Sequence, residues 1–251
     1  MSKKPFDQLS GERFIACANV RECHLRSRHA RVSGRTTVAV VSSSTHHPLT
    51  DLRIRTPRVV LRFGSVAELR ALARLAQEGI YDEAATPFSG AWIDRIGEPG
   101  FEDETVEFYR SRLRDARPDH WHLELLAFAG ETLIGSQRLS SEREREVWTG
   151  SWLGRRFQGM GYGTEMRAGV LYLAFEYLGA EAACSDAWIG NHASLAVSRK
   201  LGYVDVGTEL QYPRGEPMEH RVLRLQRARF QSPVPVEVDG LSAVLPWFGI
   251  T

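Results

Sequence analysis

The residues best suited to chemistry form a glycine-rich loop that separates a predicted strand from a predicted helix. The loop runs from Gln158 to Thr164 and carries glycine at positions 159, 161 and 163. Glycine lets the backbone approach a ligand closely, and the free N–H groups at the start of a helix attract anions with the helix dipole behind them. The spacing therefore indicates a phosphate-binding loop, with a tight turn as the structural alternative.

Two classes of phosphate ligand suit such a loop: a nucleotide in a Rossmann unit, and coenzyme A in an acyltransferase. A Rossmann loop follows the first strand of its βαβ unit, and an acidic residue lies near the end of the next strand. This loop instead follows the fourth predicted strand. The strand after it, around Cys184 to Asp186, leads into a second polar segment from Asn191 to Tyr203. The order of the elements does not match a Rossmann unit.

Hydrophobic periodicity predicts the elements that position these two segments. A capping box of Ser65 and Glu68 starts a helix that has one apolar face and stops at Gly79. Acidic residues at 102–104 start a second helix, and a third follows the loop and ends at Gly179. The other predicted elements are strands at 52–63, 120–128, 132–140, 147–153, 182–188, 203–212 and 218–225, and a short helix at 191–201. This order predicts an α/β (α+β) chain with a mixed sheet.

Three stretches together resemble the GNAT acetyltransferase superfamily. They are the run from Arg55 to Arg62, the Q-x-x-G-x-G element that starts at Gln158, and the N-x-x-S-x-x-x-S-x-x-x-G-Y element from Asn191 to Tyr203. The match covers about residues 52–228 and is most similar to the bacterial branch that resembles ribosomal-protein N-terminal acetyltransferases. The resemblance implies a mostly antiparallel sheet flanked by helices, with acetyl-CoA as co-substrate.

The resemblance also implies where coenzyme A binds. Backbone amides of the loop would hold its pyrophosphate, and Trp152 and Leu153 would part from the next strand to pair with the pantetheine arm. Asn191 would hold the arm from the other side while capping its own helix. The expected cofactor contacts are Trp152, Leu153, Arg156, Gln158, Gly159, Met160, Gly161, Tyr162, Gly163, Thr164, Asn191, Ser194 and Arg199.

Acyl transfer to an amine requires removal of a proton from the acceptor, stabilisation of an oxyanion and, in some enzymes, protonation of the sulfur. The superfamily often has a tyrosine as general acid seven residues after the asparagine, where this chain has Ser198. Ser198 is therefore the predicted proton donor, with a small residue that lets the cofactor approach as the alternative. Glu146 is the predicted general base. The other candidates for the base are Glu124, His122, Asp186, His220 and a water chain.

The acceptor is weakly specified. The residues expected to border its cleft are Trp92, His122, Tyr212 and His220. A small molecule, a peptide and a protein N-terminus are all open as amine acceptors, with direct attack through a ternary complex. The alternatives are a non-catalytic acyl-CoA-binding sensor or interaction module, and a GNAT protein that uses another acyl donor.

Charge divides the 251-residue chain into two unlike parts. Residues 1–50 hold eight basic and three acidic residues, a net charge of +5, whereas residues 51–251 hold 24 and 28, a net charge of −4. We expect a basic extension at 1–50 and a GNAT domain at 51–230. The extension is a flexible arm, the result of a start codon placed too far upstream, or an added strand or lid. We expect the tail at 231–251 to pack on the domain or on a partner subunit, which leaves a homodimer open.

Composition narrows the partners and the compartment. The acidic balance of residues 51–251 argues against nucleic acid, and no apolar run approaches the roughly 18 residues of a membrane-spanning helix. Three cysteines without a CxxC pair are typical of a reducing cytoplasm. Only three of the 32 basic residues are lysine, which suggests a GC-rich bacterial genome. We expect no metal, because Cys17, Cys23, His24 and His29 match no standard zinc spacing.

Overall fold

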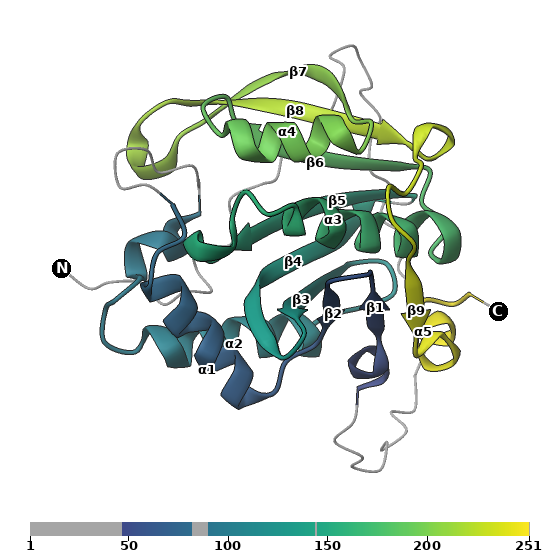
Figure 1. The fold of residues 1–251 in the computed structure, drawn as a ribbon, viewed down its shortest axis with the longest axis horizontal. Coiled ribbons are helices and arrows are strands. Elements are labelled where there is room, and N and C mark those ends of the chain that lie inside the picture. Colours follow the sequence, from purple (N-terminus) through teal and green to yellow (C-terminus); the bar gives the residue numbers. More distant parts are fainter. Residues whose placement is uncertain (1–46, 82–89, 144, 251) are drawn as a thin grey trace, which may run out of the picture.

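The computed structural model describes residues 47–81, 90–143 and 145–250. Within these ranges, nine strands form one sheet in the order β7-β8-β6-β5-β4-β3-β2-β1-β9 (Figure 1). The strands are β1 Arg53–Arg55, β2 Val60–Arg62, β3 Trp121–Ala129, β4 Thr132–Arg143, β5 Glu146–Leu153, β6 Ala182–Trp188, β7 Val204–Gln211, β8 Met218–Gln226 and β9 Glu237–Asp239. The helices are α1 Val66–Gln77, α2 Phe101–Arg114, α3 Tyr162–Tyr172, α4 His192–Lys200 and α5 Leu241–Trp247.

The predicted fold class is confirmed: the sheet is mixed and mostly antiparallel, with helices on both faces. Side chains point to alternate faces along a strand, so β3 separates two apolar layers. Leu123 and Leu125 pack in the large core that includes α3, whereas Leu126 and Phe128 pack with Leu72 and other residues of α1 and α2. The helix that follows the glycine-rich loop therefore covers one face, and the first two helices cover the other.

The strand predicted at 52–63 is instead a hairpin of β1 and β2. The two strands are antiparallel, with Arg55 opposite Val60. Thr56 donates its backbone N–H to the Val59 carbonyl at 2.9 Å, and Pro57 lies inside this turn. Proline fixes its φ angle at a value that suits a turn. Apolar residues recur on both sides of Thr56 and Pro57, and they hid the reversal because both arms of the hairpin face the same core.

The two ends of the chain differ in how much of them the structure describes. Residues 1–46, most of the predicted extension, lie outside the described residues. The C-terminal tail adds β9 to the sheet beside β1 and continues into α5. After α5, Phe248 packs edge-on against Trp121 of β3, with ring centroids 5.1 Å apart. In the described part of the chain, no helix is long and apolar enough to cross a membrane.

The predicted capping box is present at the start of α1. Glu68 donates its backbone N–H to the Ser65 hydroxyl, and its carboxylate accepts the Ser65 backbone N–H at 2.8 Å. Arg62 also donates to this carboxylate, with Nη2 2.5 Å from Oε1. The hydrogen bond from Arg62 is the main reason why the pKa of Glu68 falls from 4.5 to about 2.

This pKa shift predicts an acid-sensitive contribution to stability. A carboxylate with a lowered pKa stabilises the fold above pH 4.5, and the contribution disappears as the pH falls toward 2. We expect Glu68→Gln to lower the melting temperature at pH 6, and the difference from wild type to shrink steadily as the pH falls from 4.5 to 2. Glu107→Gln, which alters an exposed ion pair on α2, serves as the control. A difference for Glu68→Gln that is constant with pH would contradict the assignment.

Candidate active site between two diverging strands

β5 and β6 are parallel neighbours that pair over only part of their length. Pairing ends where Trp148 lies opposite Cys184. Beyond this point, and within the described residues, β5 continues to Leu153 paired only with β4, and β6 continues to Trp188 paired only with β8. Figure 1 shows the two strands moving apart toward the end of β5. The edge of β5 beyond Trp148, including the backbone of Leu153, is therefore available to an extended ligand.

The glycine-rich loop joins this end of β5 to α3. Gly159 and Gly161 have φ angles of 73° and 85°, in the left-handed region that favours glycine, and Gly161 is the N-cap of α3. In the described part of the chain, the backbone N–H groups of residues 159–163 donate to no acceptor. Unpaired amides at a helix N-terminus form an anion-binding site. The loop therefore fits the diphosphate of coenzyme A.

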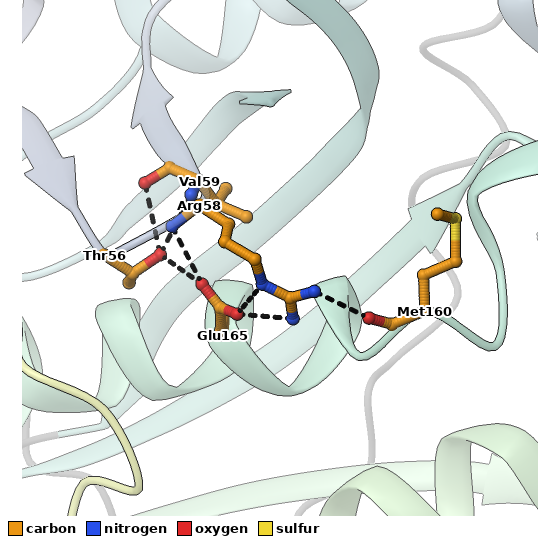
Figure 2. Close-up of polar contacts among 5 residues, drawn as sticks. All are labelled: Thr56, Arg58, Val59, Met160 and Glu165. Atoms are coloured by element: carbon orange, nitrogen blue, oxygen red, sulfur yellow. Dashed lines mark hydrogen bonds and ion pairs between the residues drawn. The ribbon is translucent and has the colours of Figure 1, made fainter. Parts of the chain in front are cut away.

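A buried carboxylate ties the loop to the β1–β2 hairpin, as Figure 2 shows. Glu165 on α3 is only 5% exposed. Its carboxylate lies 2.5 Å from Arg58 Nε, and it accepts the Arg58 backbone N–H at 3.2 Å and the Thr56 hydroxyl at 2.9 Å. Arg58 Nη1 then donates to the Met160 carbonyl at 3.0 Å. The hairpin thus fixes the backbone of the loop through one ion pair.

Two predicted cofactor contacts hold the loop in place with their side chains. The amide of Gln158 donates to the Ile80 and Leu153 carbonyls at 2.8 and 2.9 Å. Arg156 is ion-paired with Glu78. The other residues of the loop vary in exposure: Met160 is 52% exposed, while Tyr162, Gly163 and Thr164 are half-buried. The backbone, rather than these side chains, therefore offers the anion-binding groups.

α4 brings a second set of predicted residues beside α3. Asn191 caps α4, because its side-chain oxygen accepts the Ser194 backbone N–H at 3.1 Å. Ser198 is fully buried; its hydroxyl donates to the Ser194 carbonyl at 3.1 Å and accepts from Arg167 of α3 at 2.7 Å. Arg199 is exposed. Ser198 therefore faces α3, and the predicted role as proton donor requires its hydroxyl hydrogen to turn away from Ser194.

The structure does not bring Glu146 to the opening. Glu146 is the first residue of β5 and lies opposite Ala182, where the two strands are still paired. Its carboxylate forms an ion pair with Arg224 at 2.9 Å. A strand rises about 3.3 Å per residue, so Glu146 lies roughly 10 Å along the strand from Thr149, where the separation begins. The structure therefore places Glu146 at the closed end of the strand pair, in an ion pair, and away from the opening.

Asp186 occupies the opening instead, on the face of the sheet opposite α3. Ala187, its neighbour on β6, packs in the core that includes α3, so Asp186 points to the other face. Asp186 Oδ2 lies 2.8 Å from His220 Nδ1 and accepts from Gln211 Nε2 at 3.0 Å. The side chain of Asp186 is 19% exposed, whereas His220 is almost fully buried. Burial, followed by the negative charge of Asp186, raises the pKa of Glu209. This face of the opening therefore carries two neighbouring carboxyl groups.

His122 lies in a buried polar cluster between β3 and α2. Burial lowers the pKa of His122 to about 3, with a further contribution from Arg112. Burial also raises the pKa of Glu124, which is 7% exposed. Tyr109 has a raised pKa because of burial and the nearby Glu124 charge. His122 is therefore a neutral, half-buried group at neutral pH, and it is separated from Asp186 by β4 and β5.

Two segments that are far apart in sequence meet at the rim of this face. Trp92, between α1 and α2, lies 6.0 Å from Trp152 of β5, measured between ring centroids. Close to it, Asp94 accepts two hydrogen bonds from Arg214 of the β7–β8 turn, at 2.8 and 2.5 Å. Tyr212, at the start of that turn, is 60% exposed. The structure thus brings the two segments predicted to border the acceptor cleft into contact.

The sequence interpretation missed the charged residues that surround the loop. Glu165 and Arg58 form the ion pair that fixes it, and Arg167 contacts Ser198. One signal for Arg167 was present: it stands on a helix among apolar residues such as Met166 and Val170, which are fully buried. A charged residue within an apolar helical pattern indicates a buried charge, and a buried charge is almost always paired with another group.

The histidine, cysteine and acidic side chains were compared with the requirements of a metal site. In residues 47–81, 90–143 and 145–250, no three histidine, cysteine or acidic side chains are close enough together to hold a metal ion. Cys17, Cys23, His24 and His29 lie outside the described residues. Cys184 is buried.

Comparison with known proteins identifies both a family and a fold. The acetyltransferase (GNAT) domain family matches residues 58–204. RimJ from Mycobacterium smegmatis, solved with CoA-disulfide, superposes with a TM-score of 0.60 at 18% identity, over 80% of this chain and 96% of that one. The RimL ribosomal L7/L12 alpha-N-protein acetyltransferase with coenzyme A gives a TM-score of 0.57 at 15% identity, over 68% and 95% of the two chains. At these identities the likeness shows the fold.

The contact between Glu165 and Arg58 predicts a loss of cofactor affinity when it is broken. Glu165→Gln removes the charge that orients Arg58, so the Met160 carbonyl loses its fixed donor and the loop amides lose their alignment. We expect acetyl-CoA to bind about tenfold more weakly, or about 1.4 kcal/mol, by isothermal titration calorimetry. Glu68→Gln is the matched control, because it disrupts the neighbouring ion pair with Arg62 without touching the loop. Equal affinity in Glu165→Gln and Glu68→Gln would refute the argument.

Proposed function

Because the chain belongs to the GNAT acetyltransferase family, we propose that it transfers the acetyl group of acetyl-CoA directly to an amine. One observation carries the proposal: the unpaired edge of β5 leads into a loop whose backbone amides have no acceptor in the described part of the chain. These two features suit the two halves of one ligand. An extended amide arm pairs with a strand edge, and a diphosphate binds at a helix N-terminus.

Acetyl-CoA supplies an acetyl group activated as a thioester, and the chain supplies position and charge. The amides of residues 159–163 hold the diphosphate, and β5 beyond Trp148 orients the pantetheine arm along its free edge. Asn191 approaches the arm from α4. A backbone N–H of β5 near Leu153 faces the thioester carbonyl and stabilises the negative charge that develops on its oxygen.

The acceptor we propose is the α-amine of a peptide or protein. Asp186 places a partly exposed carboxylate on the face opposite α3, where it holds the neutral amine and takes the one proton that the nitrogen loses when it attacks the thioester. An α-amino group has a pKa of about 8, against about 10.4 for lysine, so far more of it is neutral at pH 7. RimL, which has the same fold, acts on the α-amine of a ribosomal protein according to its name. Both points support an N-terminal amine over a lysine side chain.

Calorimetry with acetyl-CoA tests the cofactor half of the proposal. We expect exothermic binding with a dissociation constant on the order of micromolar, which corresponds to about −8 kcal/mol. Gly161→Trp should abolish it, because a side chain at this left-handed position would occupy the phosphate site. Absence of binding by the wild-type protein at millimolar acetyl-CoA would end the proposal.

Release of the coenzyme A thiol in the presence of amines tests the catalytic half. We expect Asp186→Asn to lower kcat/KM for a peptide α-amine by about 10²-fold, the usual scale of general-base catalysis, with little change in acetyl-CoA affinity. Asp205→Asn, an exposed acid on β7 paired with Arg221, is the control and should retain full activity. If acetyl-CoA binds but no amine accelerates thiol release, the protein is an acyl-CoA sensor instead.

A further inference from the structure

Arg167 is a buried cation without a carboxylate partner. It is 3% exposed, and in the described part of the chain no acidic group lies within ion-pair distance of it. Its one hydrogen bond there is the 2.7 Å bond from Nη1 to the Ser198 hydroxyl, while its buried Nε has no partner. The titratable groups that act on it from a greater distance are Tyr203 and Asp186.

A buried cation without a carboxylate partner lowers the stability of the folded protein. Arginine stays protonated in proteins, and a buried charge that lacks an opposite charge is destabilising by several kcal/mol. A neutral hydroxyl offsets only part of this, because its dipole is weaker than a charge. We expect such a buried cation to interact with a negative charge on a bound ligand or during the reaction.

The contacts of Ser198 show where Arg167 lies relative to the opening between β5 and β6. Ser198, its partner, also accepts the Tyr203 backbone N–H at 3.1 Å through its carbonyl. The Tyr203 hydroxyl lies 3.1 Å from Thr149 Oγ1, and Thr149 is the first residue of β5 beyond the paired segment. Burial raises the pKa of Tyr203 to about 12, so it adds no negative charge near neutral pH. Arg167 and Ser198 therefore lie beneath the point where β5 and β6 separate, on the α3 side.

We propose that Arg167 is a positioning residue that polarises the Ser198 hydroxyl toward the sulfur of coenzyme A and so stabilises the thiolate. The inference rests on the function proposed above. In the transfer, the bond between carbon and nitrogen forms, the bond between carbon and sulfur breaks, and the electron pair remains on sulfur. The amine proton passes to Asp186. Arg167 thus faces the negative product from one side of the sheet while Asp186 takes the proton on the other.

The Ser198 hydroxyl can rotate so that its hydrogen points toward the sulfur. It now donates to the Ser194 carbonyl, one turn earlier in α4. That carbonyl also lies in register to accept the backbone N–H of Ser198 as part of the helix, so it keeps a donor when the hydroxyl rotates away. The Ser198 oxygen keeps accepting from Arg167 in either orientation. The hydroxyl is therefore a stronger hydrogen-bond donor than an isolated serine.

The pKa of the bound coenzyme A thiol, followed by the ultraviolet absorbance of the thiolate, tests the proposal without any acceptor or turnover. We expect the thiol in the wild-type complex to titrate at least one pH unit below free coenzyme A. Arg167→Met should return it toward the free value, Arg167→Lys should keep most of the shift, and Ser198→Ala should lose part of it. Arg110→Met, which removes an exposed arginine of α2, is the control and should titrate as wild type.

Two comparisons separate this role from a merely structural one. Arg167→Met should weaken coenzyme A binding at alkaline pH by up to about tenfold, yet bind desulfo-coenzyme A, which lacks the thiol, as tightly as wild type. The same variant should melt at or above the wild-type temperature, because it replaces an unpaired buried charge with an apolar side chain.

Failures of the two proposals are distinguishable. If the wild-type protein binds no coenzyme A, the acetyltransferase proposal fails. If it binds coenzyme A and the thiol pKa is the same in wild type, Arg167→Met and Ser198→Ala, the role of Arg167 is refuted while the acetyltransferase proposal stands. If Arg167→Met does not fold, the argument from an unpaired charge is wrong, and Ser198→Ala still decides whether the hydroxyl acts on sulfur.

Discussion

The architecture depends on the early end of pairing between β5 and β6. Backbone polar groups need hydrogen-bond partners, and a strand inside a sheet normally finds them on both sides. β5 has a neighbour on both sides only as far as Trp148, opposite Cys184; beyond this point it pairs with β4 alone among the described residues. The remaining edge gives an extended ligand a place in the middle of a nine-stranded sheet. The loop, α3, α4 and the polar groups on both faces are arranged around this interruption.

Charges of opposite sign lie on the two sides of the opening. Arg167 approaches from the α3 side through Ser198, and Asp186 lies on the other face, held by His220 and Gln211. Transfer of an acyl group from a thioester to an amine separates charge in the same sense, because sulfur gains an electron pair and nitrogen loses a proton. Each product of that separation therefore meets a group of complementary charge. Overall net charge, which is +1 for the chain, conceals this arrangement.

Local sequence signals predict most of the fold. The features that they do not predict depend on contacts between segments that are distant in the sequence. The capping box at Ser65, the strand at 182–188 and the glycine-rich loop each follow from residues a few positions apart, and the structure has all three. The prediction of one strand at 52–63 is wrong, because a hairpin with one buried face has the same apolar pattern as a strand. The position of Glu146 depends on the strand register, which places it at the closed end with Arg224 and which its local sequence does not reveal. The roles of Asp186 and Arg167 depend on which face each side chain occupies, and that is fixed by tertiary pairing.

Hydrogen exchange of backbone amides, with and without acetyl-CoA, tests the central claim most directly. In the free protein, the amides of residues 159–163 and those on the open edge of β5 beyond Trp148 have no acceptor. They should therefore exchange faster than the hydrogen-bonded amides of β5 and α3. Acetyl-CoA should slow exchange in these two segments together, with smaller effects at the start of α4. Tight binding of acetyl-CoA that leaves both segments unprotected, or that protects only another surface, would contradict the account.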